Sequence, residues 1–469
     1  MPARNAIIQF VGGAFALSTG QSGGREGPGV HLGGAVNSWL GQRLGLPNNS
    51  LRVLIACGTA GGISAAFNTP LAGVIFAMEV IIAEYTVVGF IPVMLAAVSA
   101  SAVHHSLSGG AAFIDIQAIS LNSLLEIPFI MLLGLCCGIA VAAFIRISEF
   151  ATGFAKRPVL LRFAAAGLLT GTLALVVPQI LGIGYDMLYL LVNGEVTITA
   201  LLIIAGAKLL ATAVSCGVGM PIGLIGPNLV IGGCIGAIMG SLGAMLQPEL
   251  SSGLILYVVI GMAAAMAAVL NAPLAAVLAV MEMTHTVTIA MPALLAIIIA
   301  TLTNTSLFGN RSAHQSVLRQ LQRTVPDDPL SQLLHRTDVT SIMDVRVVRV
   351  PTVLAPEDLE PLLEFTPEWC LVSREGEDLY LVQGKELLDW LAKREEPDEP
   401  ADLTEADIRR WTSASVPLQA TLRQVVDTMR SRTVETVCVH ERSSSSGKRI
   451  LHGVVTREAI EKFSLTKLY

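Results

Sequence analysis

The segment AFNTPLAGVIFAMEV at residues 66–80 has a second copy in the chain, VLNAPLAAVLAVMEM at residues 269–283. Aligned without gaps, seven of the fifteen positions are identical, including Asn-x-Pro-Leu-Ala and a Met-Glu pair near the end. Two alanine-rich helices share apolar residues by chance more easily than they share these polar and turn-forming residues in register. The two segments therefore indicate an internal duplication of the chain.

A glycine-proline turn lies upstream of each copy. It reads GREGP at residues 24–28 and GLIGP at residues 223–227. From the proline of the turn to the asparagine of the repeat there are 40 residues in the first half and 44 in the second. The turns therefore belong to the same duplicated unit as the repeats.

The composition separates a membrane part from a soluble part. Of the 469 residues 53% are apolar, and the mean hydropathy of +0.65 is typical of an integral membrane protein. Residues 1–310 hold only 19 Asp, Glu, Lys and Arg, whereas residues 311–469 hold the other 47. We therefore predict a membrane domain over 1–320 and a soluble tail over 321–469. The net charge of −6 does not favour a nucleic-acid partner.

Glycine and proline interrupt the apolar stretches of the membrane part. Several stretches are shorter than the roughly 20 residues that span a bilayer. Half-helices that end within the membrane produce this pattern, as in transporters built from inverted repeats. The predicted fold is an all-α polytopic membrane domain with inverted repeats and interrupted helices, followed by a small α/β tail. In the tail, two units are expected at about 340–392 and 415–463.

Glu26 stands among glycines at the start of a predicted helix. A helix start carries unpaired N–H groups and about half a positive charge, and glycine lets an anion approach that backbone. The helix that begins at each turn can thus direct its N-terminal amides toward a shared anion site. A carboxylate there competes with a permeating anion and acts as a gate. The alternative is that Glu26 only complements the helix dipole and pairs with Arg25.

These motifs resemble those of the CLC family of voltage-gated chloride channels and chloride/proton exchangers. GREGP resembles the family signature G-[KR]-E-G-P, and GLIGP resembles G-x-F-x-P with Ile225 in place of phenylalanine. The tail resembles the paired CBS domains that many members carry on the cytoplasmic side. The resemblance implies a multi-pass homodimer with one chloride pathway in each subunit, and Glu26 matches the gating glutamate. It also implies an anion site lined by Gly24, Arg25, Gly27, Gly223, Leu224, Ile225 and Gly226, with the Leu224 and Ile225 amides as donors.

The chain departs from the family pattern at three places. The signature G-S-G-I-P is absent, which suggests that the N-terminal helices of the family fold are missing. The inner proton glutamate of exchangers would follow Glu79, but Val80 stands there, as in channel members; Glu84 is the substitute candidate. The late pore tyrosine aligns with His314, which is equally consistent with a surface histidine at the start of the tail.

Chloride transport of a channel-like kind is thus the leading prediction, and the chain is not expected to be an enzyme. A chloride/proton antiporter using Glu79 or Glu84 is one alternative. A CBS-tailed cation transporter is another, but its membrane carboxylates should cluster. No metal site is predicted and no cofactor is expected. An adenine nucleotide at the CBS pair is disfavoured, because Ala459 in GVVTREA occupies the place of the ribose-binding acid.

Three further polar groups in the membrane part have structural interpretations. Lys208 is expected to extend toward the membrane surface or to pair with a carboxylate. Glu79 and Glu282, which occupy matching repeat positions, are expected to cap or pair at helix ends rather than to carry protons.

Overall fold

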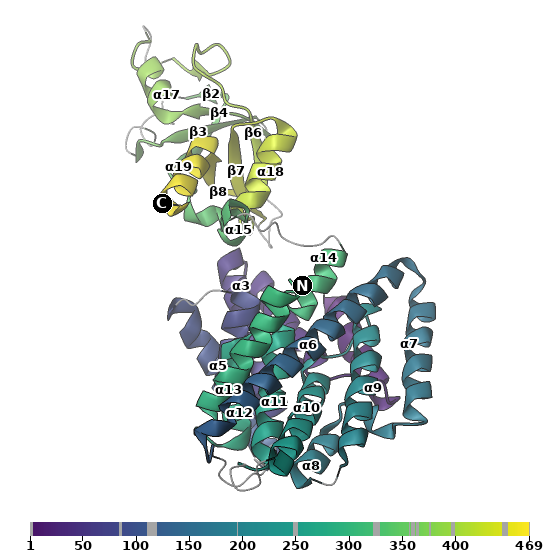
Figure 1. The fold of residues 1–469 in the computed structure, drawn as a ribbon. Helices are drawn as coiled ribbons and strands as arrows, with labels where there is room; N and C mark the ends of the chain where they lie inside the picture. The colour runs from purple at the N-terminus through teal and green to yellow at the C-terminus, as the bar shows by residue number, and fades with distance from the viewer. Residues whose placement is uncertain are drawn as a thin grey trace. The chain divides into compact units, whose positions relative to one another are not determined.

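The computed structural model describes most of the chain in two compact units (Figure 1). The described residues are 3–83, 87–109, 120–194, 196–246, 252–321, 329–355, 357, 362, 365–374, 377–394, 399–442 and 449–468. The first unit comprises residues 1–44 and 51–324, and the second comprises residues 45–50 and 325–469. The division at 324 lies close to the sequence boundary at 320.

Helices are the regular secondary structure of the first unit among its described residues, apart from an isolated bridge between Gly24 and Gly223. Its α-helices are α1 (Ala3–Ser18), α2 (Glu26–Arg43), α3 (Asn48–Phe67), α4 (Pro70–Phe76), α5 (Val87–Ser108), α6 (Ile127–Thr152), α7 (Val159–Ala174), α8 (Tyr185–Asn193), α9 (Ile198–Gly217), α10 (Ile225–Leu246), α11 (Leu254–Leu270), α12 (Pro273–Thr284), α13 (Ala290–Leu302) and α14 (Ala313–Gln320). Short 3-10 and π turns join or extend them: η1 (Ala77–Ile82), η2 (Leu124–Glu126), η3 (Gly153–Lys156), η4 (Pro178–Ile180) and η5 (Thr303–Leu307).

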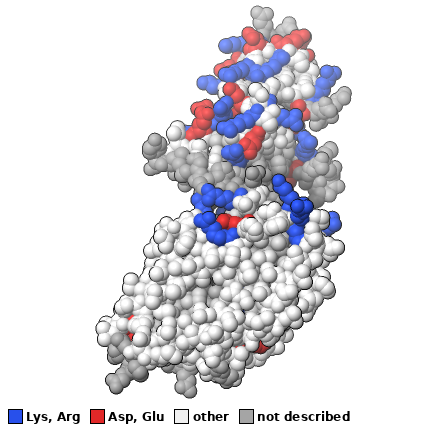
Figure 2. Space-filling model, turned by 45° about the vertical axis from the view of Figure 1, so that its right-hand side comes forward, with Lys and Arg blue, Asp and Glu red and all other residues white. Residues whose placement is uncertain are grey.

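Six helical segments among the described residues are long and apolar enough to cross a membrane. They cover 48–67, 89–108, 124–156, 198–217, 225–246 and 290–307. Other apolar helices are shorter, among them the two repeat segments 70–82 and 273–284. Figure 2 shows that the surface of this unit is almost free of charged side chains on the face drawn, whereas charges cover the tail. The predicted membrane domain with interrupted helices is therefore confirmed.

Helix α11 forms the centre of the first unit. Its residues from Leu256 to Leu270 are buried, and α6, α10 and α13 pack around it (Figure 1). A helix that is apolar on every side belongs either in a protein core or in lipid, and here neighbouring helices cover it. The duplicated motif that follows α11 is thus held in the interior of the unit.

The Asn-x-Pro motif explains where the interrupted helices break. Asn68 and Asn271 have φ values of 56° and 57°, in the left-handed region that asparagine tolerates better than most residues. Each ends a helix, α3 or α11, and a proline then begins the next one, α4 or α12. Proline suits a first helical position because its missing N–H has no partner to lose there.

The Met-Glu pair explains what joins the two copies. Glu79 accepts hydrogen bonds from the amides of Leu274 (3.3 Å) and Ala275 (2.9 Å) at the start of α12. Glu282 accepts from the amides of Leu71 (2.9 Å) and Ala72 (2.8 Å) at the start of α4. Each repeat thus supplies the carboxylate that caps the half-helix of the other.

The tail is an α/β unit. Its described helices are α15 (Pro329–Arg336), α17 (Gly384–Leu391), α18 (Leu422–Arg432) and α19 (Arg457–Leu468), with a 3-10 turn at η6 (Val339–Ser341). Its strands are β1 (Val347–Pro351), β2 (Val353–Leu354), β3 (Trp369–Arg374), β4 (Glu377–Gln383), β5 (Ala401–Asp402), β6 (Ser413–Pro417), β7 (Thr436–Arg442) and β8 (Arg449–Thr456).

The two halves of the tail repeat one sheet pattern. In the first half β1 runs parallel to β3 and β3 antiparallel to β4; in the second, β6, β7 and β8 pair in the same way. Trp369 and Leu381 of the first half share a buried cluster with Cys438 and Val454 of the second. The α/β tail with two similar units is therefore confirmed, and its halves pack against each other.

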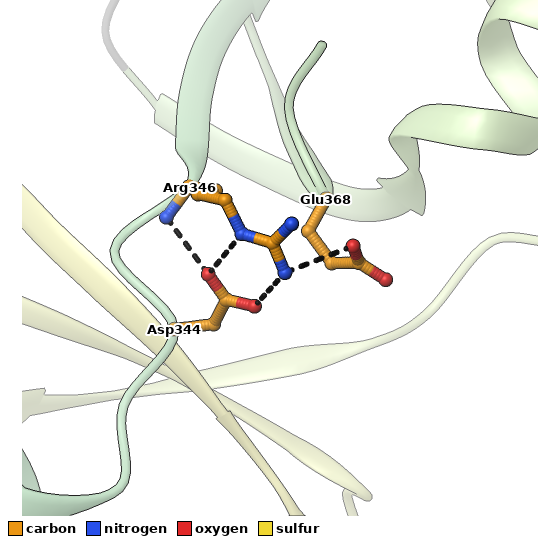
Figure 3. A network of polar contacts seen from close by, with 3 residues as sticks. All are labelled: Asp344, Arg346 and Glu368. Atoms are coloured by element: carbon orange, nitrogen blue, oxygen red, sulfur yellow. Dashed lines mark hydrogen bonds and ion pairs between the residues drawn. The ribbon is translucent and has the colours of Figure 1, made fainter.

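A polar network fixes the entry to β1 (Figure 3). The Arg346 guanidinium donates to both carboxylate oxygens of Asp344, at 3.3 Å and 2.9 Å, and lies 3.1 Å from Glu368. The Arg346 amide also donates to Asp344 at 2.9 Å. Burial favours a higher pKa for Asp344, but these bonds outweigh it and hold the pKa below its usual value.

Candidate functional site

The two glycine turns meet in the first unit although about 200 residues separate them. The Gly24 amide donates to the Gly223 carbonyl at 2.8 Å, and the Gly223 amide donates to the Gly24 carbonyl at 2.7 Å. This antiparallel pair places the start of α2 beside the start of α10. The expectation that both turns address one place is therefore consistent with the backbone geometry.

Glu26 bridges the two helix starts. It is the first residue of α2, only 2% of its surface is exposed, and its Oε1 accepts a hydrogen bond from the Gly226 amide at 3.0 Å. The Ile225 amide of α10 also faces this carboxylate. Its Oε2 has no hydrogen-bond partner among the described residues. The Glu26 side chain thus occupies the N-terminal end of the second repeat's helix.

At the glycines of the two turns, the carboxylate and the opposite turn fill the space that a side chain would take. A Cβ on Gly24 would lie 2.0 Å from Glu26 Oε1, and a Cβ on Gly223 would lie 2.5 Å from the same atom. A Cβ on Gly27 would lie 2.9 Å from the Gly223 Cα. Close approach of backbone to an anion is a common reason for glycine.

Arg25 does not pair with Glu26 in the described structure. Its guanidinium donates to the Ala66 carbonyl at 3.0 Å and stands 5.5 Å from the ring centre of Tyr185. The ion pair that the sequence offered as an alternative for Glu26 is therefore absent from the described residues. Arg25 instead ties the first turn to the end of α3.

Leu224 and Ile225 are buried at the start of α10. The Leu224 carbonyl accepts from the amide and the side chain of Asn228, at 3.2 Å and 2.8 Å. Both bonds fix the first turn of α10, whose Ile225 and Gly226 amides face the Glu26 carboxylate.

The remaining candidates lie apart from the two turns. His314 lies in the first turn of α14 with an exposed side chain, and no recorded contact joins it to the glycine turns. Glu79 caps α12, and the neighbouring Val80 is half-buried against the apolar core. Glu84, the substitute proton candidate, lies outside the described residues.

Several polar residues around the first turn escaped the sequence interpretation. Gln21 donates to the hydroxyls of Thr170 and Ser215, and the Ser22 hydroxyl lies 2.8 Å from that of Thr212. All are buried or half-buried in an apolar unit. The available signal was the polar pair Gln21-Ser22 directly before the glycines, but its partners lie 149 to 194 residues away.

The membrane carboxylates do not form a cation site within the described residues. No group of three metal-ligating side chains is present there. Glu126 is bound by Ser252 and by the Tyr257 hydroxyl at 2.8 Å, while Glu79 and Glu282 are engaged at helix starts. Four further acids of the membrane part lie outside the described residues: Glu84, Asp115, Glu195 and Glu249. The described geometry gives no support to a clustered site for a hard cation.

Comparisons with known proteins agree with this picture. The H(+)/Cl(−) exchange transporter ClcA of Vibrio cholerae serotype O1 (strain M66-2) is 30% identical over 336 residues, which cover 69% of this chain and 71% of ClcA. The solved structure of a slow cyanobacterial Cl−/H+ antiporter has a TM-score of 0.63 and 24% identity, over 68% of this chain and 77% of that one. A eukaryotic CLC transporter structure has a TM-score of 0.52 and 21% identity, over 94% of this chain and 77% of that chain.

The two structures show a shared fold, and the last match extends into the tail. The relatives are membrane transporters rather than enzymes, in line with the expectation from the sequence. The family model described as "Voltage gated chloride channel" matches residues 1–305. Together with the two glycine turns and the interrupted repeats, this match establishes that the chain belongs to the voltage-gated chloride channel, or CLC, family.

Proposed function

We propose that the chain carries chloride across a membrane along a path that Glu26 gates. One observation carries the proposal: the Glu26 carboxylate, itself an anion, accepts the Gly226 amide at the start of α10. A helix start with free amides binds anions without a full opposite charge, so the ion can leave again. The Vibrio relative is named an H(+)/Cl(−) exchange transporter, which supports chloride as the ion.

The gate works by competition for the amides of α10. While the carboxylate is ionised and bound, a chloride ion cannot take the same donors. Protonation weakens the charge-assisted bond to Gly226 and lets the side chain leave, which opens the path. Acid on the side from which protons reach Glu26 should therefore increase chloride flux.

Little proton movement should accompany this flux. Val80 stands in the place of the inner proton glutamate, and a buried proton path without a titratable group is unfavourable. Exchange remains the main competing function, because the Vibrio relative is an exchange transporter. In that case Glu84 is the first candidate carrier.

The test is Glu26→Gln in chloride-loaded liposomes, with a chloride electrode and a pH electrode. We expect steady chloride flux that no longer rises in acid, while the wild type conducts better at low external pH. Glu149→Gln is the matched control, since Glu149 lines a surface groove on α6 with Arg146 and Gln320. It should retain the wild-type pH response.

Three results would contradict parts of the proposal. Cation flux without anion selectivity under a salt gradient would exclude chloride transport. Wild-type pH dependence in Glu26→Gln would reduce Glu26 to a helix cap and make His314 the next sensor to test. A fixed chloride-to-proton ratio that Glu84→Gln abolishes would establish exchange instead of channel-like flow.

We further propose a homodimer with one pathway per subunit and a cytoplasmic tail. The tail would contribute folding and subunit contact rather than nucleotide sensing. In support, the Thr456 hydroxyl accepts the Ala459 amide at 3.1 Å, so the end of β8 caps α19 and offers no carboxylate for a ribose. Calorimetry with ATP, ADP and AMP on residues 325–469 should show weak binding or none.

A further inference from the structure

Lys208 is an unusual residue for the place it occupies. It lies in the middle of α9, a segment of 20 residues apolar enough to span a membrane, and its side chain is fully buried at 0% exposure. The sequence interpretation, in which Lys208 extends to the surface or pairs with a carboxylate, is therefore wrong for the described residues. A buried ammonium is costly in such surroundings, which makes a functional role the default hypothesis.

The ammonium group of Lys208 binds one short loop. Its Nζ donates to the carbonyl of Ile180 at 3.0 Å and to the carbonyl of Gly182 at 3.2 Å. This loop joins η4 to α8 and contains two glycines in the left-handed region, Gly182 with φ 60° and Gly184 with φ 92°. A Cβ on Gly184 would lie 3.0 Å from Lys208 Nζ, so the loop closes tightly around the lysine.

The same loop holds the segment that leads into the first glycine turn. The Gly182 carbonyl accepts the Gly23 amide at 3.3 Å, and the Gly182 amide donates to the Gly20 carbonyl at 3.2 Å. One carbonyl, that of Gly182, thus receives both Lys208 and Gly23. Because a carbonyl oxygen has two acceptor positions, the lysine and the turn can bind it together.

A second contact joins the loop to the other turn. The Ile183 side chain packs on Gly226, where an added Cβ would lie 2.8 Å from Ile183 Cγ2 and 3.8 Å from Glu26 Oε2. Gly226 is the residue whose amide binds Glu26. The loop therefore contacts both glycine turns directly beside the carboxylate.

We propose that Lys208 is a positioning residue for the Glu26 site, acting by hydrogen bonds to the Ile180–Gly184 loop. The ammonium fixes two carbonyls, the loop then fixes Gly23 on one side and Gly226 on the other, and the amides of α10 stay aligned with the carboxylate or with a bound anion. This role rests on the proposed chloride function.

The experiment compares Lys208→Met with Lys208→Arg in the purified full chain. Methionine keeps the length and apolar stem but has no donor, whereas arginine keeps donors and charge. We expect Lys208→Met to weaken chloride binding by about tenfold in calorimetry, the equivalent of about 1.4 kcal/mol, and to flatten the pH dependence of flux. Lys208→Arg should remain within about threefold of the wild type, a shift of under 1 kcal/mol.

Two further variants keep the test decisive. Arg146→Met is the matched control: Arg146 also donates to a backbone carbonyl in this unit, that of Phe308 at 3.1 Å, but far along the chain from both turns. It should bind chloride normally. If Lys208→Met does not fold, Ile183→Ala tests the same loop and should weaken chloride binding with the pH response again flattened.

The outcomes separate this inference from the proposed function. Folded Lys208→Met with wild-type chloride affinity and pH response would overturn the positioning role alone. Wild-type protein that neither binds nor passes chloride would overturn the proposed function first. In the Glu26→Gln background Lys208→Met should still weaken chloride binding, because the α10 amides lose alignment, but it should have no pH response left to change.

Discussion

The two halves of the membrane unit share the same structural devices but differ in the side chains of the glycine-proline turn. Each has a glycine-proline turn, a left-handed asparagine, a half-helix that begins at proline and a glutamate that caps the other half. At the third position of the turn, the first half has Glu26 and the second half has Ile225. The shared features form the helical framework. The difference places a carboxyl side chain, that of Glu26, in the first turn only.

This contrast shows how a duplicated fold becomes asymmetric: only one of its two turns carries a carboxylate. If both turns carried carboxylates, two like charges would face each other beside the paired Gly24 and Gly223 backbones. With a carboxylate on one side only, the helix start of the other half can bind it. The asymmetry therefore gives one helix start a carboxylate and leaves the other with the amide that binds it.

Filling the shared backbone contact should have the largest effect. Gly223→Ala puts a methyl group 2.5 Å from Glu26 Oε1 and 2.7 Å from the Gly27 amide nitrogen, so backbone or carboxylate must shift. Overpacking of this kind costs about 1–3 kcal/mol of folding stability, and because the shift falls on the backbone that faces Glu26, we expect a large loss of chloride flux. Chloride efflux from loaded liposomes measures this loss.

The control for this variant is Gly206→Ala. Gly206 lies in α9 with no atom near the added methyl group, so flux should be unchanged and the helix slightly more stable. Equal flux in Gly223→Ala and the wild type would mean that the two turns do not need to touch for transport.

Removing the reciprocal caps should have an intermediate effect that is nearly the same in both halves. Glu79→Ala and Glu282→Ala each leave two amides at a helix start without a partner, at a cost of about 0.5–2 kcal/mol. Thermal unfolding in detergent should show similar drops in Tm, slightly larger for Glu282→Ala because its two bonds are shorter.

Unequal effects of Glu79→Ala and Glu282→Ala would reveal a second difference between the two halves. If Glu79→Ala changes proton movement while Glu282→Ala changes only the Tm, then Glu79 belongs to a proton path and the halves differ at a second carboxylate. Ala279→Ser, a conservative change at a buried α12 position that caps nothing, gives the baseline for substitution in this helix.

In the tail, a buried histidine of the second half faces a carboxylate of the first half. His440 of β7 is buried, its Nδ1 lies 3.0 Å from the Ser415 hydroxyl, and its Nε2 lies 3.3 Å from Asp378 of β4. Burial lowers the pKa of His440, and Arg349 and Arg449 lower it further, while Asp378 acts in the opposite direction. The folded tail therefore prefers the neutral ring.

The sign of the pH effect follows from this preference. The unfolded histidine, with an ordinary pKa near 6.5, binds a proton before the folded one does. Stability is thus complete above that pH and falls as the pH drops below it toward the folded pKa. Calorimetry of residues 325–469 between pH 7.5 and 5 should show a decline in Tm of a few degrees, reduced in His440→Gln. His452→Gln, on β8 beside Glu441, should leave the decline intact.

The sequence alone was sufficient for the framework. Charge distribution separated the membrane unit from the tail, and the apolar stretches interrupted by glycine and proline predicted helices that end within the membrane. These features depend on local chemistry: a left-handed asparagine, a proline at a first helical position and a glycine beside an anion act on their own neighbours in the chain. The two turns were recognisable for the same reason.

Tertiary structure decided which distant groups meet. Nothing in the repeat shows that Glu79 binds Ala275 rather than a residue of its own half, or that Lys208 binds Gly182. The helical period reports which face a residue shares, but the partner across that face depends on how helices far apart in sequence cross. For this reason the sequence placed Glu26 at a helix start, while only the folded chain determined that the helix start it binds belongs to the other repeat.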